Sequence, residues 1–366
     1  MTPRVPRIAI VIDDLGHGGA QRQLFLIAES LRERARLQVI AFAVPEHPYA
    51  ARLRAAGVDV TGIPRRSSVD LRRLRDLTAT LRAFRPDVIH GFLDASNAYA
   101  YLAARQLRVP AVLSLRSDRL RARGVRSLAL RAMLRAAAAV VTNSLAGHDY
   151  LVDHVGVASA RVTHVPNIVV AQAPRPAPED PLLVGCVGRL VALKRFDAVI
   201  EAVAIVRRTH PATTLLVVGD GPAAQDLRDA ARALGVDDAV CFAGAVEDTA
   251  PLFARMACLV VASEHEGLPN AALEAMAAGV PVVAVPAGDL PRLVVDGVTG
   301  ILATDASPPT LAAAITRALT DPALARTAAR EGPRAIAAGF APEIAAARLL
   351  ELYSRLINEP GASTRV

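Results

Sequence analysis

Short apolar runs alternate with longer amphipathic stretches in the first half of the chain. Stretches at 21–34, 49–56 and 69–84 repeat apolar residues with helical spacing and predict helices. The apolar runs, which predict buried strands, lie at 7–12, 37–44, 59–64, 87–92, 111–116, 139–143 and 162–167. Such alternation of strands and helices is typical of an α/β fold with a parallel sheet.

The same alternation restarts after residues 171–181, where four prolines predict an extended linker. Further strands are predicted at 181–188, 214–221, 239–244, 258–263, 280–285 and 299–303, with helices at 198–208, 223–234 and 270–278. We therefore predict two Rossmann-like, doubly wound domains, at 1–170 and 171–366, with a last helix at about 344–357.

Composition places the chain among folded proteins without a membrane span. Of its 366 residues, 52% are apolar and 21% charged, which excludes intrinsic disorder. No stretch of about 18 residues is free of charge. The first apolar run ends at Asp13 and is too short for a signal peptide, so we expect a cytoplasmic protein. Cys186, Cys241 and Cys258 are odd in number and lack metal-ligand spacing, which predicts core cysteines in a reducing compartment.

Charge is distributed unevenly. Residues 1–170 hold 25 Arg and 13 acidic residues, a net charge of +12, whereas residues 171–366 carry a net charge of −5. The basic half suits an anionic lipid surface or a phosphorylated substrate, and an arginine-rich solvated surface explains it equally well. Nucleic acid is disfavoured, because aromatic residues make up only 4% and no DNA-binding motif accompanies the arginines. Lys194 is the only lysine, which suggests a position where a compact ammonium is needed.

Candidate chemistry follows the predicted strands, where open α/β sheets bind ligands. Gly18 and Gly19 allow the backbone to approach a phosphate or sugar closely, although the loop lacks the third glycine of a dinucleotide fingerprint and also suits a tight turn. In the second half, Arg189 and Lys194 flank a helix start and suit a diphosphate, while two surface cations are the alternative. No Asp-x-Asp metal motif is present.

The most specific segment is 262–274, directly after a buried strand. Glu266 precedes a predicted helix that opens with Pro269 and Asn270, and Glu274 lies one turn inside that helix. Two carboxylates and several helix N-terminal amides are thereby directed at one ligand. The acids would accept hydroxyl hydrogens, and the amides would face anionic oxygens.

Four segments together resemble the family-four retaining glycosyltransferases of the GT-B fold: GRLVALKRFD, VVGDGP, SEHEGLPNAALEAMAAGVPVVA and a GGAQ loop in the first domain. The resemblance spans nearly the whole chain in order and spacing. It implies two domains facing across a cleft, with the sugar nucleotide on the C-terminal domain and the acceptor on the N-terminal domain. The last helix would cross back toward the N-terminal domain.

The resemblance also implies a role for each matching residue. Arg189 and Lys194 would hold the nucleotide diphosphate, and Glu274 would bind the ribose. Glu266 would contact the donor sugar together with backbone amides, and these three residues, Glu266, Arg189 and Lys194, are the expected catalytic group. The remaining expected donor-binding residues are Gly18, Gly19, Gly188, Gly267, Leu268 and Asn270.

The first domain departs from the family pattern at Arg116 and at Phe92, which stands where a second histidine is often found two residues after His90. His90 ends a strand as in the family, and a hydrogen-bonded strand-end imidazole is the alternative to a site role. Arg116 stands where many members have a histidine near the reacting centre. It would orient a phosphate or an acceptor hydroxyl with Asp118, or form an internal ion pair with it. Asn143 ends a further strand and is a third candidate.

The function implied is transfer of a hexose, with retention, to a hydroxyl of a glycan or lipid-linked acceptor in cell-surface polysaccharide or glycolipid synthesis. A UDP-sugar is the favoured donor and a GDP-sugar also fits, with no metal or other cofactor required. The basic domain would contact an anionic membrane at its cytoplasmic face, and no nucleic acid is expected. The alternatives are a nucleotide-sugar epimerase or phosphorylase on this fold, or a non-enzymatic nucleotide- or nucleic-acid-binding module.

Overall fold

A computed structural model describes residues 4–42, 47–64, 70–120, 122, 124–170, 180 and 182–358. The chain divides into two compact units. Unit 1 comprises the residues up to Ile168 together with those from Pro342 onward, and unit 2 comprises Val169–Ala341. Within the described ranges, none of the helices combines the length and the apolar character that crossing a bilayer requires.

Unit 1 is built on a seven-stranded parallel sheet with strand order β3-β2-β1-β4-β5-β6-β7. Its strands are β1 (Arg7–Ile12), β2 (Arg36–Ala41), β3 (Asp59–Gly62), β4 (Val88–Gly91), β5 (Ala111–Leu115), β6 (Ala139–Thr142) and β7 (Val162–His164). Its α-helices are α1 (Gly19–Leu31), α2 (Pro48–Ala55), α3 (Leu71–Phe84), α4 (Asp94–Leu107), α5 (Gly124–Ala136), α6 (Leu145–Asp149) and α14 (Pro342–Asn358). A π-helix at Tyr150–Val155 and a 3-10 turn at Ser159–Arg161 precede β7.

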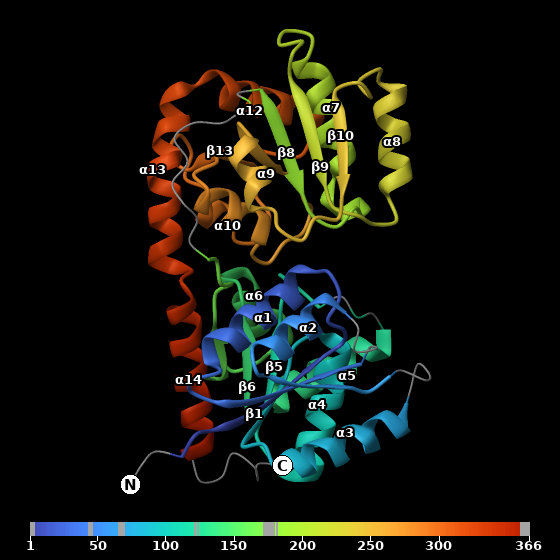
Figure 1. The fold of residues 1–366 in the computed structure, drawn as a ribbon, viewed down its shortest axis with the longest axis vertical. Coiled ribbons are helices and arrows are strands. Elements are labelled where there is room, and N and C mark those ends of the chain that lie inside the picture. Colours follow the sequence, from blue (N-terminus) through green and yellow to red (C-terminus); the bar gives the residue numbers. More distant parts are fainter. Residues whose placement is uncertain are drawn as a thin grey trace. The chain divides into compact units, whose positions relative to one another are not determined.

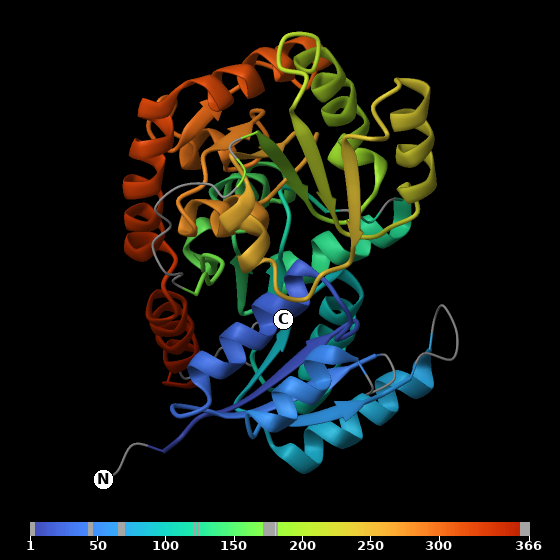
Figure 2. The same cartoon turned by 45° about the horizontal axis from the view of Figure 1, so that its top comes forward.

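Helices cover both faces of this sheet, because successive strand residues point to opposite sides. Ile8 and Ile10 of β1 join one buried cluster with residues of α1, α2 and α14. Ala9 and Val11 join a second cluster with residues of α3, α4 and α5. The red helix α14 packs beside the blue helix α1 (Figure 2). The C-terminal helix is therefore a structural part of the first unit.

Unit 2 repeats the architecture with six parallel strands in the order β10-β9-β8-β11-β12-β13, of which β8, β9 and β10 lie side by side in Figure 1. The strands are β8 (Leu183–Val187), β9 (Thr214–Val218), β10 (Val240–Gly244), β11 (Cys258–Val261), β12 (Val282–Ala284) and β13 (Gly300–Leu302). The helices are α7 (Phe196–Val206), α8 (Ala224–Ala233), α9 (Ala250–Arg255), α10 (Asn270–Ala277), α11 (Leu290–Leu293), α12 (Pro308–Thr320) and α13 (Pro322–Gly339), with a 3-10 turn at Ala192–Lys194.

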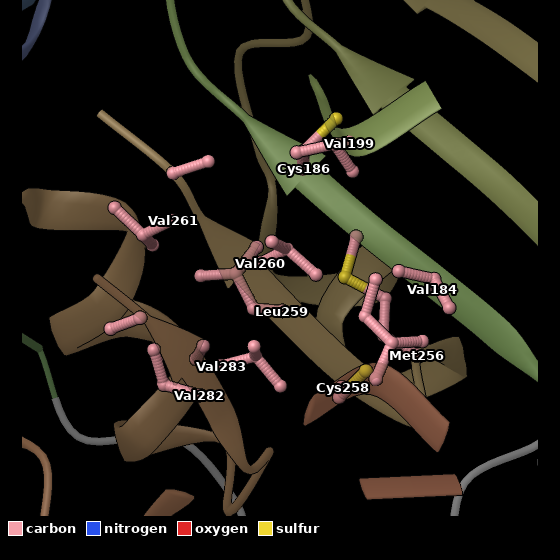
Figure 3. Close-up of a cluster of buried hydrophobic side chains, with 14 of the residues drawn as sticks. Val184, Cys186, Val199, Met256, Cys258, Leu259, Val260, Val261, Val282 and Val283 are labelled. Atoms are coloured by element: carbon pink, nitrogen blue, oxygen red, sulfur yellow. The ribbon is translucent and has the colours of Figure 1, made fainter. Parts of the chain in front are cut away.

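The core of unit 2 is a single apolar cluster, and valine is the commonest residue of its central strands β8 and β11. Figure 3 shows Met256 beside Val184 and Cys258. A side chain at Gly185 would begin 2.2 Å from the Met256 sulfur, so glycine leaves the room that this methionine fills. Cys186 and Cys258 are buried core residues, and burial raises the pKa of both thiols. The prediction was wrong for Cys241, which is exposed on β10, a strand at the edge of the sheet.

The strands predicted from the apolar runs are all present, and the fold class is confirmed as α/β with two parallel sheets. The predicted linker lies outside the described residues except for Asp180, and so do Val69 and the residues after Asn358. The helix expected at about 344–357 is α14, which spans Pro342–Asn358.

Candidate functional site

Two of the expected site residues of unit 2, Lys194 and Glu266, meet where the strand order reverses. β8 and β11 are neighbours in the sheet, and their following connections lead in opposite directions, which is the position where doubly wound sheets bind ligands. Lys194 lies in the loop after β8 and Glu266 in the loop after β11. The Lys194 Nζ donates a hydrogen bond to Glu266 Oε1, and the two side chains are only 22% and 11% exposed. The Glu264 amide also donates to the Leu193 carbonyl (2.9 Å), which joins the two loops through their backbones.

Glycines allow neighbouring loops to pack against this ion pair. A side chain at Gly188 would lie 3.8 Å from Lys194 Cε, so Gly188 borders the lysine stem. Gly219 has a φ of 136°, and a Cβ there would lie 1.9 Å from the Gly188 carbonyl oxygen. At Gly288, where φ is 54°, a Cβ would lie 2.1 Å from the Glu266 carbonyl oxygen and 2.5 Å from that of Gly267. Only glycine fits both positions, because a side chain would displace the backbone that carries the pair.

Helix α10 supplies the second carboxylate. Glu274 is buried, at 6% exposure, and its Oε2 accepts a hydrogen bond from Thr249 Oγ1 (2.9 Å) at the start of α9. Gly267 and Leu268 are buried just before the helix, Asn270 is its partly exposed first residue, and Arg189 is exposed beside Gly188. The structure thus joins Lys194 directly to Glu266, with Gly188 bordering the lysine and Gly267 next to Glu266 in the chain. Glu274 lies on helix α10, where Thr249 hydrogen-bonds it.

In unit 1, the glycine-rich loop after β1 is held by a carboxylate. Asp14 Oδ1 accepts hydrogen bonds from the Gly16 amide (2.9 Å) and the Gln21 side chain (2.9 Å). Gln21, which stands in place of a third glycine, therefore fastens the loop to α1. Gly18 and Gly19 are exposed at the N-terminus of α1. The neighbouring Asp13 accepts from the Ser96 amide (2.7 Å), and burial raises the pKa of its carboxyl.

His90 is a buried strand-end imidazole in this structure. Its Nδ1 hydrogen-bonds Tyr353 Oη (2.7 Å) on α14, and its Nε2 hydrogen-bonds Ser114 Oγ (2.7 Å) on β5. Burial, with a further contribution from the positive charge of Arg116, lowers the His90 pKa to about 3. The neutral His90 ring, with both nitrogens hydrogen-bonded, connects α14 to the sheet. Because His90 is only 2% exposed, it leaves little surface for a ligand.

Arg116 follows β5 and is joined to residues that follow the next two strands. Its Nη2 donates to Asn167 Oδ1 (2.7 Å), which also accepts from Asn143 Nδ2 (3.2 Å). Its guanidinium carbon lies 4.8 Å from the centre of the Phe92 ring. The ion pair considered with Asp118 is not formed, since Asp118 pairs with Arg119 at 3.2 Å.

Two residues that hold the unit 2 site were not predicted from the sequence. Thr249 lies in the connection after β10. The sequence feature that could have indicated it is a hydroxyl residue just before a short helix. Gly288 follows β12. The sequence feature that could have indicated it is the Gly-Asp step after a buried strand. In the described portion of the chain, no three His, Cys, Asp or Glu side chains gather in a way that would hold a metal ion.

Two family models match this chain. The model described as Glycosyltransferase Family 4 matches residues 17–172, and the model described as Glycosyl transferases group 1 matches residues 181–321. The matched segments contain the glycine loop and Arg116 in unit 1, and Lys194, Glu266 and Glu274 in unit 2.

Similar proteins support the same family. The glycogen synthase of Mycobacterium tuberculosis is 32% identical over 300 residues, covering 77% of this chain and 71% of that protein. The D-inositol 3-phosphate glycosyltransferase of Stackebrandtia nassauensis is 31% identical over 314 residues, covering 76% and 70%. Among solved structures, Anabaena HepE in complex with UDP-glucose superposes with a TM-score of 0.86 at 23% identity, covering 95% of this chain and 99% of that chain. The fold is GT-B, and the chain belongs to the group 1 glycosyltransferases.

Proposed function

We propose that this glycosyltransferase moves a hexose from a UDP-sugar, with retention of configuration, to a hydroxyl of a glycan or lipid-linked acceptor. The observation that carries the proposal is the pairing of Lys194, the only lysine of the chain, with Glu266 at the strand switch point of unit 2. A cation and a carboxylate in contact there suit a donor that carries a diphosphate next to a hydroxyl-rich sugar. GDP-sugars are the second donor class.

Each residue of the unit 2 site has a part in the proposed chemistry. Lys194 and the exposed Arg189 stabilise negative charge that develops on the departing diphosphate, an electrostatic contribution that often dominates rate enhancement. Glu274 accepts hydrogen bonds from the ribose hydroxyls, and Thr249 fixes its orientation. Glu266 positions the donor sugar, together with the backbone of Gly267, Leu268 and Asn270. The leaving phosphate, rather than a protein carboxylate, accepts the proton of the attacking hydroxyl.

The acceptor belongs to unit 1 in this proposal, and unit 2 holds the donor. The names of similar proteins support a carbohydrate or sugar-phosphate acceptor, since they include a glycogen synthase, a D-inositol 3-phosphate glycosyltransferase and a lipopolysaccharide core glycosyltransferase of Rhizobium meliloti. HepE in complex with UDP-glucose supports UDP as the nucleotide to test first.

A nucleotide panel tests the donor site. We would measure the thermal stability of the full chain with UDP, GDP, ADP and CDP in the presence of a chelator. We expect one diphosphate to stabilise the wild type, Glu274→Gln to lose that shift, and Glu201→Gln, a change of an exposed glutamate on α7, to keep it. If no diphosphate stabilises the wild type, the donor proposal is wrong.

Turnover distinguishes transfer from the rival activities. A nucleotide-sugar epimerase would convert the donor without any acceptor, whereas the proposed enzyme releases nucleoside diphosphate in proportion to glycosylated product. The anomeric configuration of the product, read by NMR, tests retention directly. Salt-sensitive oligonucleotide binding without sugar transfer would favour the non-enzymatic alternative.

We further propose that unit 1 docks on an anionic membrane surface through α5. This helix exposes Val125 (82%) and Leu128 (68%) beside Arg126 and carries no acidic residue. Apolar side chains next to arginines suit the interface of an anionic bilayer. The wild type should co-sediment with phosphatidylglycerol vesicles and not with phosphatidylcholine vesicles. The double variant V125D/L128D should remain free, and an unchanged distribution of the wild type on adding anionic lipid would contradict this docking.

A further inference from the structure

Arg116 lies at a position where side chains from several strands meet. It directly follows β5, Asn143 directly follows β6, and Asn167 comes shortly after β7. The three side chains form a chain of hydrogen bonds, from Arg116 Nη2 to Asn167 Oδ1 and from Asn143 Nδ2 to the same oxygen. Because β5, β6 and β7 are parallel neighbours, the cluster occupies one edge of the sheet, the edge at which such sheets bind ligands.

Among the residues that the structure describes, no carboxylate balances the charge on the Arg116 guanidinium. Its Nη1 is buried and makes no hydrogen bond to any residue that the structure describes. Its hydrogen-bonded partner is a neutral amide, and its flat face lies on Phe92. The nearest acid in sequence, Asp118, is paired with Arg119 instead. A buried donor left without a partner costs on the order of 1–3 kcal/mol, and more when it is charged.

The surroundings of Arg116 do not neutralise its guanidinium. Burial lowers the Arg116 pKa to about 10, so the side chain stays protonated at neutral pH. His90 is the neighbour with which it interacts electrostatically, and that imidazole is neutral. The positive charge is therefore uncompensated within the described part of unit 1.

An acceptor atom accompanies the unpaired donor. Asn143 Oδ1 is also buried and, across the described ranges, has no hydrogen-bond partner. An unpaired cationic donor and an unpaired amide oxygen, linked through Asn167, match a ligand that offers an anionic oxygen and a hydroxyl on one molecule. Arg116 is partly exposed as a residue, so part of its side chain remains open to solvent.

We propose that Arg116 and Asn143 bind an anionic group of the acceptor, a phosphate or carboxylate, together with a hydroxyl next to it. Arg116 donates to the anion through Nη1, and Asn143 Oδ1 accepts from the hydroxyl. This inference rests on the proposed transferase function and narrows its acceptor to a phosphorylated or acidic sugar or lipid headgroup. Arg116 is then a specificity-determining residue of this chain.

Phosphate binding provides the direct test. Inorganic phosphate titrated into the full chain, followed by the width of its ³¹P signal, should bind the wild type with saturation. Arg116→Met keeps an unbranched stem against Phe92 and removes the charge, and we expect its affinity to fall at least tenfold. Arg116→Lys should restore part of it. Arg119→Met removes an exposed arginine of the same loop and should bind as the wild type does. Equal phosphate binding by wild type and Arg116→Met would overturn the proposal.

Melting temperature and UDP binding distinguish an acceptor site from a structural arginine and from the donor site. Without ligand, Arg116→Met should melt at or above the wild-type temperature, since it removes an uncompensated charge, whereas a purely structural arginine would lower the melting temperature when lost. UDP binding should be unaffected by Arg116→Met, because the donor site lies in unit 2. Loss of UDP binding in this variant would assign the anion to the donor and overturn the proposal. Failure of UDP to bind the wild type would instead contradict the proposed function alone.

Glucose 6-phosphate tests the paired recognition. It should compete with inorganic phosphate more effectively than an equal concentration of glucose, and Asn143→Ala should reduce this advantage while leaving phosphate binding itself in place. Equal competition by glucose and glucose 6-phosphate would overturn the anion requirement.

Discussion

Lys194 and Glu266 lie 72 positions apart in the chain, and the Nζ of the lysine donates a hydrogen bond to Oε1 of the glutamate. The cation proposed to hold the diphosphate is thus compensated by the carboxylate proposed to position the sugar. A diphosphate that binds Lys194 competes with Glu266 for the ammonium, whereas a sugar hydroxyl needs the carboxylate oxygens. If these proposed roles hold, the pair couples diphosphate binding to sugar positioning.

This competition makes Glu266→Gln an informative change. The variant keeps the side-chain shape and removes the negative charge beside Lys194, so we expect UDP to bind at least as tightly as to the wild type. Transfer should fall about 100-fold or more, since the sugar loses its carboxylate. Isothermal titration with UDP and product formation from the donor sugar measure the two effects.

Glu264→Gln is the matched control for that change. Glu264 is exposed in the same loop and lies 3.6 Å from Arg195, so the variant should leave both quantities near wild type. If Glu266→Gln weakens UDP binding and transfer equally, Glu266 does not compete for Lys194 and the coupling described above is wrong.

The same pair should contribute measurably to folding. Both side chains are mostly buried, so a double-mutant cycle of Lys194→Met and Glu266→Gln should give a coupling free energy on the order of 1–3 kcal/mol in chemical denaturation. The exposed pair Arg317–Asp296, with N···O at 3.0 Å, should give less than about 1 kcal/mol. Equal coupling for the two pairs would show that burial at the site does not strengthen the interaction.

Low pH should reduce the stability of unit 1 because of His90. The folded-state pKa of about 3 lies below the ordinary value of 6.5, so the folded state binds fewer protons than the unfolded state. Above pH 6.5 His90 is neutral in both states and does not lower the free energy of unfolding. As the pH falls from 6.5 toward 3, the unfolded state takes up a proton that the folded state does not, and the free energy of unfolding decreases. Between pH 6.5 and 5 the loss is about 2 kcal/mol, at roughly 1.4 kcal/mol per pH unit.

A glutamine at position 90 isolates this contribution. His90→Gln should show a smaller drop in the urea midpoint between pH 7.5 and pH 5 than the wild type. His17→Gln, which changes an exposed histidine, should show the full drop. An identical drop in the wild type and His90→Gln would mean that His90 is not held neutral by burial.

The parallel sheets were predictable because their strands are buried on both faces and appear as continuous apolar runs. The unit 2 loops were predictable as a site because Glu266, Glu274 and Lys194 follow or flank such runs in a recognisable order. Their pairing was not, since nothing in a sequence states that Lys194 turns toward Glu266. His90 shows the converse limit, because its partner Tyr353 lies 263 positions away on a helix whose docking depends on the tertiary structure.

Gly288 is the position where the unit 2 site should be most sensitive to a single methyl group. Its φ of 54° and the carbonyl oxygen of Glu266, 2.1 Å from a built Cβ, both oppose a side chain. Gly288→Ala should therefore push the Glu266–Gly267 backbone away from Lys194, lowering transfer by about tenfold or more and lowering stability. Gly297→Ala shares the positive φ, 73°, but meets only the flexible end of Arg317 at 3.6 Å. It should cost about 1 kcal/mol of stability and leave transfer unchanged.

Steady-state transfer rates and denaturant midpoints of Gly288→Ala and Gly297→Ala distinguish the two explanations. If both variants lose activity equally, backbone strain rather than contact with Glu266 explains the need for glycine at position 288.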